Sequence, residues 1–130
     1  MQLLGIHHVA IICSNYPRSK HFYSEILKLT IINEHYRAQR QSYKLDLALP
    51  DGSQLELFSF NDAPSRPSYP EAQGLRHLAF KVGCINTAKH YLESHNVIVE
   101  NIREDEITGK KFTFLPIQMA YPLSYMHFNI

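Results

Sequence analysis

Two histidines and one glutamate have the residue types and positions to act together on a metal ion. His8 lies in the β-branched, apolar stretch 5–13, and His77 lies in the similar stretch 75–83. Glu56 lies within "SQLELFSF", where a lone carboxylate is costly to bury unless it is paired or binds a metal. Two imidazoles and a carboxylate form a borderline-soft site suited to Zn, Ni, Fe or Mn. We therefore expect a divalent metal ion, with His8, Glu56 and His77 as its ligands.

Each of these residues also has a simpler interpretation. A single histidine on a strand is more often a hydrogen-bonded core or surface residue than a ligand. Glu56 can lie on a solvent-facing strand surface, which is the commoner place for a glutamate. What favours the metal site is the repeat-related placement of the two histidines. The other histidines near these motifs are interpreted as structural or surface residues: His7, His21, His90 and His95.

The first half of the chain predicts the order strand, helix and three strands. The stretch 5–13 is read as a strand. Ser14 or Asn15 can cap the following helix, and Pro17 suits its first turn. The apolar stripe of that helix is Phe22, Ile26, Leu27 and Leu29. Strands are expected at about 30–38, about 42–49 and 53–60, with a tight hairpin at Asp51-Gly52.

The second half predicts a similar order after a Pro-rich link. Residues 61–74 have no periodicity and are expected to form a loop or linker. We expect a strand in 75–83, a helix in 85–96, a strand in 97–105, and then a turn leading into one more strand that includes 112–114.

The two halves resemble each other residue by residue. Residues 8–23 align with 77–92 without a gap, at an offset of 69 residues. The alignment matches His8 with His77, Ala10 with Ala79, Lys20 with Lys89, and His21 with His90. With the matching element order, this favours an internal duplication. The expected organisation is a first module at 1–60, a linker at 61–74 and a second module at 75–130. If the modules pack with approximate two-fold symmetry, His8 and His77 face a shared cleft.

The composition limits the classes of protein to consider. At 130 residues the chain suits one compact domain or two small half-domains that share a core. A net charge of +1 gives no electrostatic attraction to nucleic acid or anionic lipid. Cys13 and Cys84 lack CxxC spacing, which indicates free thiols in a reducing compartment. We find no signal peptide and no apolar run of roughly 20 residues, so we expect a cytoplasmic protein without a membrane span.

Three motifs resemble those of the vicinal oxygen chelate superfamily, and most closely its glyoxalase I-like branch of small bacterial proteins. They are "HHVAI", "LELFSF" after the Asp-Gly turn, and "GLRHLAF". The resemblance implies an α+β fold of two βαβββ modules, forming a U-shaped mixed sheet around a metal cleft, and usually a homodimer with a small-molecule substrate. It implies His8, Glu56 and His77 as ligands, together with a glutamate on the last strand. A carboxylate ligand also serves as the catalytic base, a role that falls to Glu56.

The tail departs from this pattern. The repeat places the counterpart of Glu56 near residue 125, where Ser124 and Tyr125 stand, and residues 115–130 contain no acidic side chain. We expect the last strand, about 121–127, to be disrupted. Read in another frame from the third base of codon 115, the tail can give "SNPNGLPLELY", which resembles the family's usual ending and places a glutamate at 124. The genetic code fixes the glycine and only permits the glutamate. Our hypothesis is a one-base loss near codons 114–115.

Three functions remain open. The first is a glyoxalase-like metal-dependent lyase or isomerase, impaired here by the missing fourth ligand. The second is an Fe(II) dioxygenase of the same superfamily, for which two histidines and a carboxylate are a suitable platform. The third is a metal-free protein that binds and sequesters a small molecule such as a drug. Five basic residues could bind an anionic substrate, but scattered basic residues are more often solvated surface, and none is singled out: Arg37, Arg40, Arg76, Arg103 and Lys111.

Overall fold

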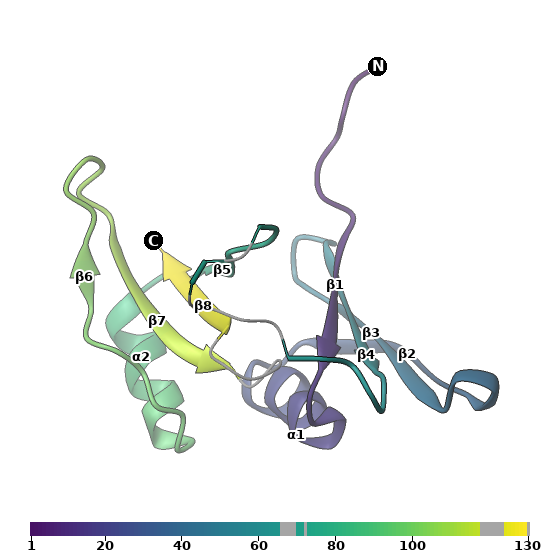
Figure 1. Ribbon diagram of the computed structural model, residues 1–130. Coiled ribbons are helices and arrows are strands. Elements are labelled where there is room, and N and C mark those ends of the chain that lie inside the picture. The colour runs from purple at the N-terminus through teal and green to yellow at the C-terminus, as the bar shows by residue number, and fades with distance from the viewer. Residues whose placement is uncertain (66–69, 72, 118–123, 130) are drawn as a thin grey trace. The chain divides into compact units, whose positions relative to one another are not determined.

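The computed structural model describes residues 1–65, 70–71, 73–117 and 124–129, with only the backbone described for 117 and 124–129. The described residues divide into two compact units, one built on residues 1–65 and the other on 70–71, 73–117 and 124–129. Each unit contains one four-stranded mixed sheet and helical segments (Figure 1). Among the described residues, no helix combines the length and apolar character that a membrane span requires.

The sheet of the first unit has the strand order β1-β4-β3-β2. Its strands are β1 (His8–Cys13), β2 (Thr30–Arg37), β3 (Ser42–Ala48) and β4 (Gln54–Ser59). β1 runs parallel to β4, and the other two pairs are antiparallel. The three strands expected at about 30–38, about 42–49 and 53–60 are confirmed. The first strand begins at His8. The carbonyl of His7 still accepts the N–H of Gln54 at 3.0 Å, and the residues before His7 extend away from the sheet (Figure 1).

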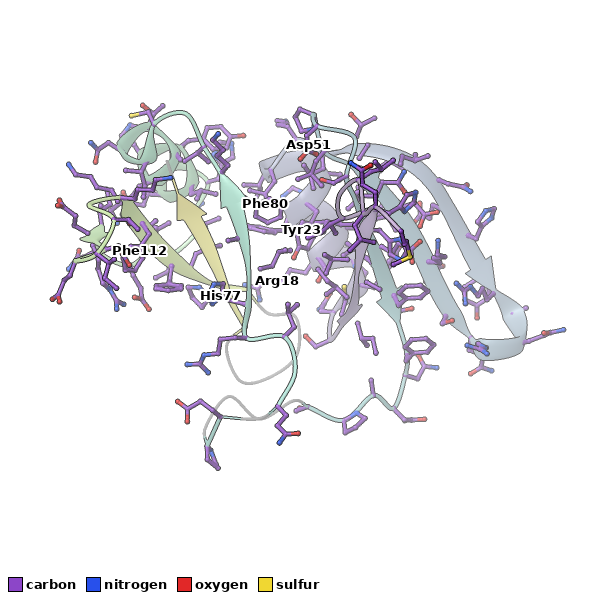
Figure 2. All side chains as sticks on the ribbon, turned by 90° about the horizontal axis from the view of Figure 1, so that it is seen from above. Arg18, Tyr23, Asp51, His77, Phe80 and Phe112 are labelled. Atoms are coloured by element: carbon purple, nitrogen blue, oxygen red, sulfur yellow. The ribbon has the colours of Figure 1, made fainter. Side chains whose placement is uncertain are left out.

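The hairpin between β3 and β4 forms where the Asp-Gly pair predicts it. Gly52 has a φ of +87°, which favours glycine, and its N–H donates to the carbonyl of Leu49 at 3.0 Å. The Asp51 carboxylate (Figure 2) accepts hydrogen bonds from both the backbone N–H and the hydroxyl of Ser53. The turn fixes the β3–β4 register, and with it the face on which Glu56 lies.

The helical segment of the first unit starts as predicted and ends differently. Helix α1 (Tyr16–His21) is capped by Asn15, whose side-chain oxygen accepts the N–H of Arg18 at 3.0 Å. It continues as a π-helical turn, η1 (Phe22–Ile26), in which the N–H of Leu27 reaches the carbonyl of Phe22. This wider turn rotates the buried face, so that Tyr23 (Figure 2) is fully buried although it is absent from the predicted stripe.

The core of the first unit lies between this helical segment and one face of the sheet. Alternate strand residues are buried there, namely Leu45, Leu47, Leu55 and Leu57. Tyr16 links the two layers, since its ring stacks on Tyr43 and its hydroxyl donates to a carboxylate oxygen of Glu34 at 2.7 Å. Because side chains alternate along a strand, the residues between these buried positions lie on the opposite face of the sheet.

The second unit repeats this topology with the strand order β5-β8-β7-β6. Its elements are β5 (His77–Lys81), α2 (Ile85–Ser94), β6 (Arg103–Glu104), β7 (Lys111–Ile117) and β8 (Ser124–Asn129). β5 is parallel to β8, as β1 is to β4. In Figure 1, α2 lies beside β7, and its residues Ile85 and Leu92 are buried. The predicted strand at 75–83 and the predicted helix at 85–96 are confirmed with shorter bounds.

The strand predicted at 97–105 is wrong for most of its length, because only Arg103–Glu104 forms a strand. Side chains hold the carbonyl oxygens that a strand ladder would otherwise use. The Lys89 ammonium donates to the carbonyls of Val99 and Glu100 at 3.0 and 3.1 Å, and the Thr113 hydroxyl donates to that of Glu100 at 2.8 Å. The segment is thus held to the helix and to β7 by these side-chain hydrogen bonds, together with one backbone bond from the Glu100 N–H to the carbonyl of Phe114 at 2.8 Å.

The predicted disruption of the last strand is also wrong for the backbone of Ser124–Asn129. These residues form β8, which pairs antiparallel with β7 and parallel with β5. Backbone hydrogen bonding does not depend on the missing acidic residue, so a tail of different sequence still forms a ladder. The expectation for residues 121–123 falls outside the described residues.

Candidate metal and substrate site on the first sheet

The residues of interest in the first unit lie on the face of the sheet opposite the helical segment. We call this the polar face and define it by His8 on β1, Glu56 and Phe58 on β4, Lys44 and Asp46 on β3, and Asn33, His35 and Arg37 on β2. The strand register supports the assignment, because Asp46 pairs with Glu56, Lys44 with Phe58, and His35 with Lys44. Paired residues on neighbouring strands lie on the same face of a sheet.

His8 and Glu56 meet on this face, as the metal-site prediction requires of them. Glu56 lies opposite Ala10, so it is diagonal to His8 across the parallel pair β1–β4. The His8 Nε2 and Glu56 Oε2 atoms are 3.8 Å apart. Two ligands at about 2.1 Å from one zinc ion in tetrahedral geometry are separated by roughly 3.4 Å. A movement of a few tenths of an ångström therefore suffices for these two atoms to share one metal ion.

The orientation of the His8 ring is set by its neighbour. Its Nδ1 lies 2.9 Å from Nδ1 of His7, so one ring donates and the other accepts. When His8 is the donor, its Nε2 carries a lone pair toward Glu56, which is the form that binds a metal. His7, which we interpreted as structural or surface, therefore orients a candidate ligand.

Lys44 and Asp46, which the sequence analysis did not single out, complete the arrangement around Glu56. The Lys44 ammonium donates to Asp46 Oδ1 at 2.5 Å and to Glu56 Oε1 at 2.9 Å. The three side chains are only 17–21% exposed, so these ion pairs are partly shielded from water. The hydrogen bond to Asp46, and then that to Glu56, raises the pKa of Lys44 above its usual value. Lys44 is therefore positively charged at neutral pH and leaves Oε2 of Glu56 directed at His8.

The alternation of side chains along β3 indicates from the sequence alone that Lys44 and Asp46 lie on the same face. In "SYKLDLA", Leu45 and Leu47 belong to the core, so Lys44 and Asp46 must share the other face. That this face is the one that carries Glu56 follows only from the β3–β4 register.

His77 lies at the start of β5, in the second unit (Figure 2). Its ring makes an edge contact with Phe114 on β7, with the ring centroids 6.0 Å apart. His21, His90 and His95 lie on or at the end of helices, which is consistent with their exclusion from the candidate site. Within the residues that the structure describes, no three His, Cys, Asp or Glu side chains form a group that could hold one metal ion.

The register places the counterpart of Glu56 in the second unit at His127, two residues beyond position 125, near which the repeat predicts it. Glu56 pairs with Ala10, and the repeat-related Ala79 pairs with His127. The counterpart position is thus two residues later than the fixed offset predicts, because the second unit has two more residues between its paired strands β5 and β8. A histidine therefore occupies the register position that a carboxylate occupies in the first unit.

Comparisons with known proteins agree with this topology. The chain is 53% identical to uncharacterized protein YwkD of Bacillus subtilis over 114 residues, covering 88% of this chain and 89% of YwkD. It is 52% identical to uncharacterized protein YaeR of Escherichia coli over 121 residues, covering 93% and 94% of the two chains. The crystal structure of a glyoxalase family protein from Enterococcus faecalis superimposes with a TM-score of 0.89 at 41% identity, over all of both chains.

The family assignment rests on most of the sequence. Residues 5–121 match the sequence model of the Glyoxalase/Bleomycin resistance protein/Dioxygenase superfamily, whose members often bind divalent metal ions. The similarity of the solved structure and the topology of each unit lead to the same assignment. The chain therefore belongs to the Glyoxalase/Bleomycin resistance protein/Dioxygenase superfamily.

Proposed function

We propose that this protein is a glyoxalase-like, metal-dependent lyase or isomerase that acts on a small substrate with vicinal oxygens. The observation that carries the proposal is the pair formed by His8 Nε2 and Glu56 Oε2, 3.8 Å apart on neighbouring strands. In this proposal His77 is the third ligand, and the metal lies in a cleft shared by the two modules. The donor set of two imidazoles and one carboxylate suits Zn, Ni, Fe or Mn.

Glu56 has the central role in the proposed chemistry. A bound metal ion would polarise a substrate carbonyl and stabilise the negative charge that develops on its oxygen. Glu56 would remove a proton from the adjacent carbon and return it at the neighbouring position, so that the carboxylate is regenerated. Lys44 holds Oε1, which leaves Oε2 as the atom available to accept the proton or bind the metal.

The proposed activity is impaired in this chain. The family resemblance implies a fourth ligand on the last strand, and the tail has no acidic residue to provide it. Three protein ligands are enough for many catalytic zinc sites, so metal binding is weakened rather than abolished. The hypothesis of a one-base loss near codons 114–115 stays part of this proposal.

A second candidate, a metal-free protein that sequesters a small molecule, is favoured by one observation. Lys44 already neutralises one of the two negative charges of Asp46 and Glu56 without any metal ion. A face whose charge is partly compensated in this way depends less on a bound cation for its stability. The Fe(II) dioxygenase stays a third possibility. Oxygen uptake by protein that was first loaded with Fe(II) in the absence of air would distinguish the dioxygenase from the other two candidates.

The proposed setting is a cytoplasmic homodimer that binds neither nucleic acid nor membrane. Both cysteines are free, with Cys13 buried and Cys84 exposed, which agrees with a reducing compartment. The net charge of +1 provides no attraction to polyanions.

The test is the metal content of the purified protein after loading with Zn or Ni, measured by mass spectrometry. The protein is compared with a version whose residues 115–126 are replaced by "FSNPNGLPLELY". We expect about one metal ion per chain in the restored version, less in the present chain, and a further loss in His8→Ala and His77→Ala. His95→Ala is the matched control and should bind as its parent does.

The outcomes separate the candidates. If neither version takes up metal, the ligand assignment fails and the sequestering protein becomes the better explanation. If both bind metal equally, the site is supported but the tail is not the cause of impairment. If His8→Ala binds as its parent does, the metal lies elsewhere.

A further inference from the structure

The polar face contains a positive charge, on Arg37, that no carboxylate among the described residues neutralises. Lys44 is paired with both Asp46 and Glu56. Arg37, at the end of β2, forms no ion pair with a carboxylate among the described residues, although its side chain is half-buried. An arginine is always charged at physiological pH, and its planar group presents several donors in a fixed fork. A half-buried guanidinium without an acidic partner is thus available to an anion.

An aromatic ring fixes the position of this guanidinium. The Arg37 Cζ lies 5.1 Å from the centroid of the Phe58 ring, and the Lys44 ammonium lies 5.9 Å from the same centroid. Phe58 is stacked in turn on Phe60, with an interplanar angle of 4°. The contact with Phe58 holds the Arg37 guanidinium beside the ring before any ligand arrives.

We propose that Arg37 and Phe58 form an anion subsite on the polar face, and that the substrate is a small carboxylate whose carboxyl group binds there. The part of this inference that concerns the substrate rests on the proposed function. Carboxylate binding by Arg37 does not, since it requires neither a metal ion nor turnover. Asn33 Nδ2 and His35 Nε2 are 2.7 Å apart on the same strand and face, so the second ring nitrogen of His35 remains as an additional polar group beside the subsite.

The test uses pyruvate, its neutral amide pyruvamide, and inorganic phosphate as probes of the full-length protein. Each is titrated in the metal-free and Zn-loaded states while the side-chain N–H resonance of Arg37 is followed by nuclear magnetic resonance. We expect pyruvate to shift this resonance to saturation, and pyruvamide to bind at least about ten-fold more weakly because it lacks the charge.

Two variants and a matched control test whether Arg37 is the residue that binds the carboxylate. Arg37→Gln should bind pyruvate at least about ten-fold more weakly, whereas Arg37→Lys should be intermediate because it keeps the charge and loses the fork. Arg40→Gln, which removes an exposed arginine three residues away, should bind as the parent protein does. Arg37→Lys also keeps the test decisive if Arg37→Gln does not fold.

The outcomes are distinct from those of the metal test. Equal binding of pyruvate and pyruvamide, or full pyruvate affinity in both Arg37 variants, would overturn the subsite. Phosphate binding ten-fold tighter than pyruvate would overturn the choice of a carboxylate. If no metal binds but pyruvate binding depends on Arg37, the subsite stands while the proposed lyase or isomerase activity fails.

Discussion

Asp46 and Glu56 lie directly opposite each other on β3 and β4, with both carboxylates held by the one ammonium group of Lys44. Like charges at directly opposed positions destabilise an antiparallel pair, so the shared lysine compensates a repulsion built into the register. The same contact selects which oxygen of Glu56 faces His8. Stability of the sheet and orientation of the proposed base therefore depend on one side chain.

Replacement of this lysine should destabilise the protein in a pH-dependent way. Because the pKa of Lys44 is raised on folding, the stability that charged Lys44 contributes is fully present below the usual lysine pKa of 10.5. It is lost as the pH rises through the pKa of Lys44 in the folded state. We expect Lys44→Met to lower the free energy of unfolding at pH 7 by about 1–3 kcal/mol. The difference should shrink at about pH 3, where carboxylates become protonated. Urea denaturation at both pH values measures this, with the exposed Lys110→Met as control.

Glu34 should stabilise the contact between α1 and β2 at neutral pH but not at acidic pH. Hydrogen bonds from Lys20 and then from Tyr16 lower the pKa of Glu34 below its ordinary value of 4.5. Because its pKa is lowered on folding, ionised Glu34 stabilises the folded protein above pH 4.5, and this stabilisation is lost as the pH falls through the pKa of Glu34 in the folded state. Since the pair is about one-third exposed, Glu34→Gln should cost only roughly 0.5 kcal/mol at pH 7. Equal costs at pH 7 and at about pH 3 would contradict this assignment.

The two cysteines should differ strongly in reactivity. Cys84 is exposed, and a hydrogen bond from the side chain of Thr87 lowers its pKa. Cys13 is buried, and burial raises its pKa. Because the thiolate is the reactive form, we expect a chromogenic disulfide reagent to modify Cys84 rapidly and Cys13 only on unfolding. The variant Cys84→Ser should lose the rapid phase alone, and a rapid phase that persists in it would show that Cys13 is accessible.

Two tyrosines should resist ionisation until the protein unfolds. Burial is the main reason that the pKa values of Tyr16 and Tyr23 are raised above 10. Their neutral form is the one that the fold favours, so stability is lost as the pH rises beyond the usual tyrosine value of about 10. A spectrophotometric titration should show late ionisation that coincides with loss of the far-ultraviolet dichroism signal. The Tyr16→Phe variant should reduce the amplitude of the late step.

The sequence predicted the local elements where side chains report directly on backbone conformation. Asn15 and Pro17 located the start of α1, and Asp51-Gly52 located the hairpin. The prediction failed where distant side chains compete for backbone groups. Lys89 and Thr113 hold the carbonyls of the segment predicted as a strand at 97–105, and nothing in the local sequence of that segment reveals them.

The candidate site was predictable in its donor types and only partly in its members. His8 was identified because the internal repeat matches it with His77, and Glu56 because a lone carboxylate in an apolar strand is costly to bury. The β1–β4 register brings His8 and Glu56 together. Whether His77 joins them remains a prediction. Lys44 and Asp46 were missed because alternation assigns residues to a face without saying which faces of neighbouring strands coincide.

By itself, the sequence determined the order of elements, the internal repeat and the superfamily, because hydrophobic period, turn residues and motif spacing are local properties of the chain. The tertiary structure alone decided the strand register. That register brings Lys44 within ion-pair distance of Glu56, places Arg37 against Phe58, and puts His127 rather than residue 125 at the position related to Glu56 by the repeat. The physical reason is that register depends on hydrogen bonding between strands far apart in sequence, and a shift of even one residue moves every side chain to the other face.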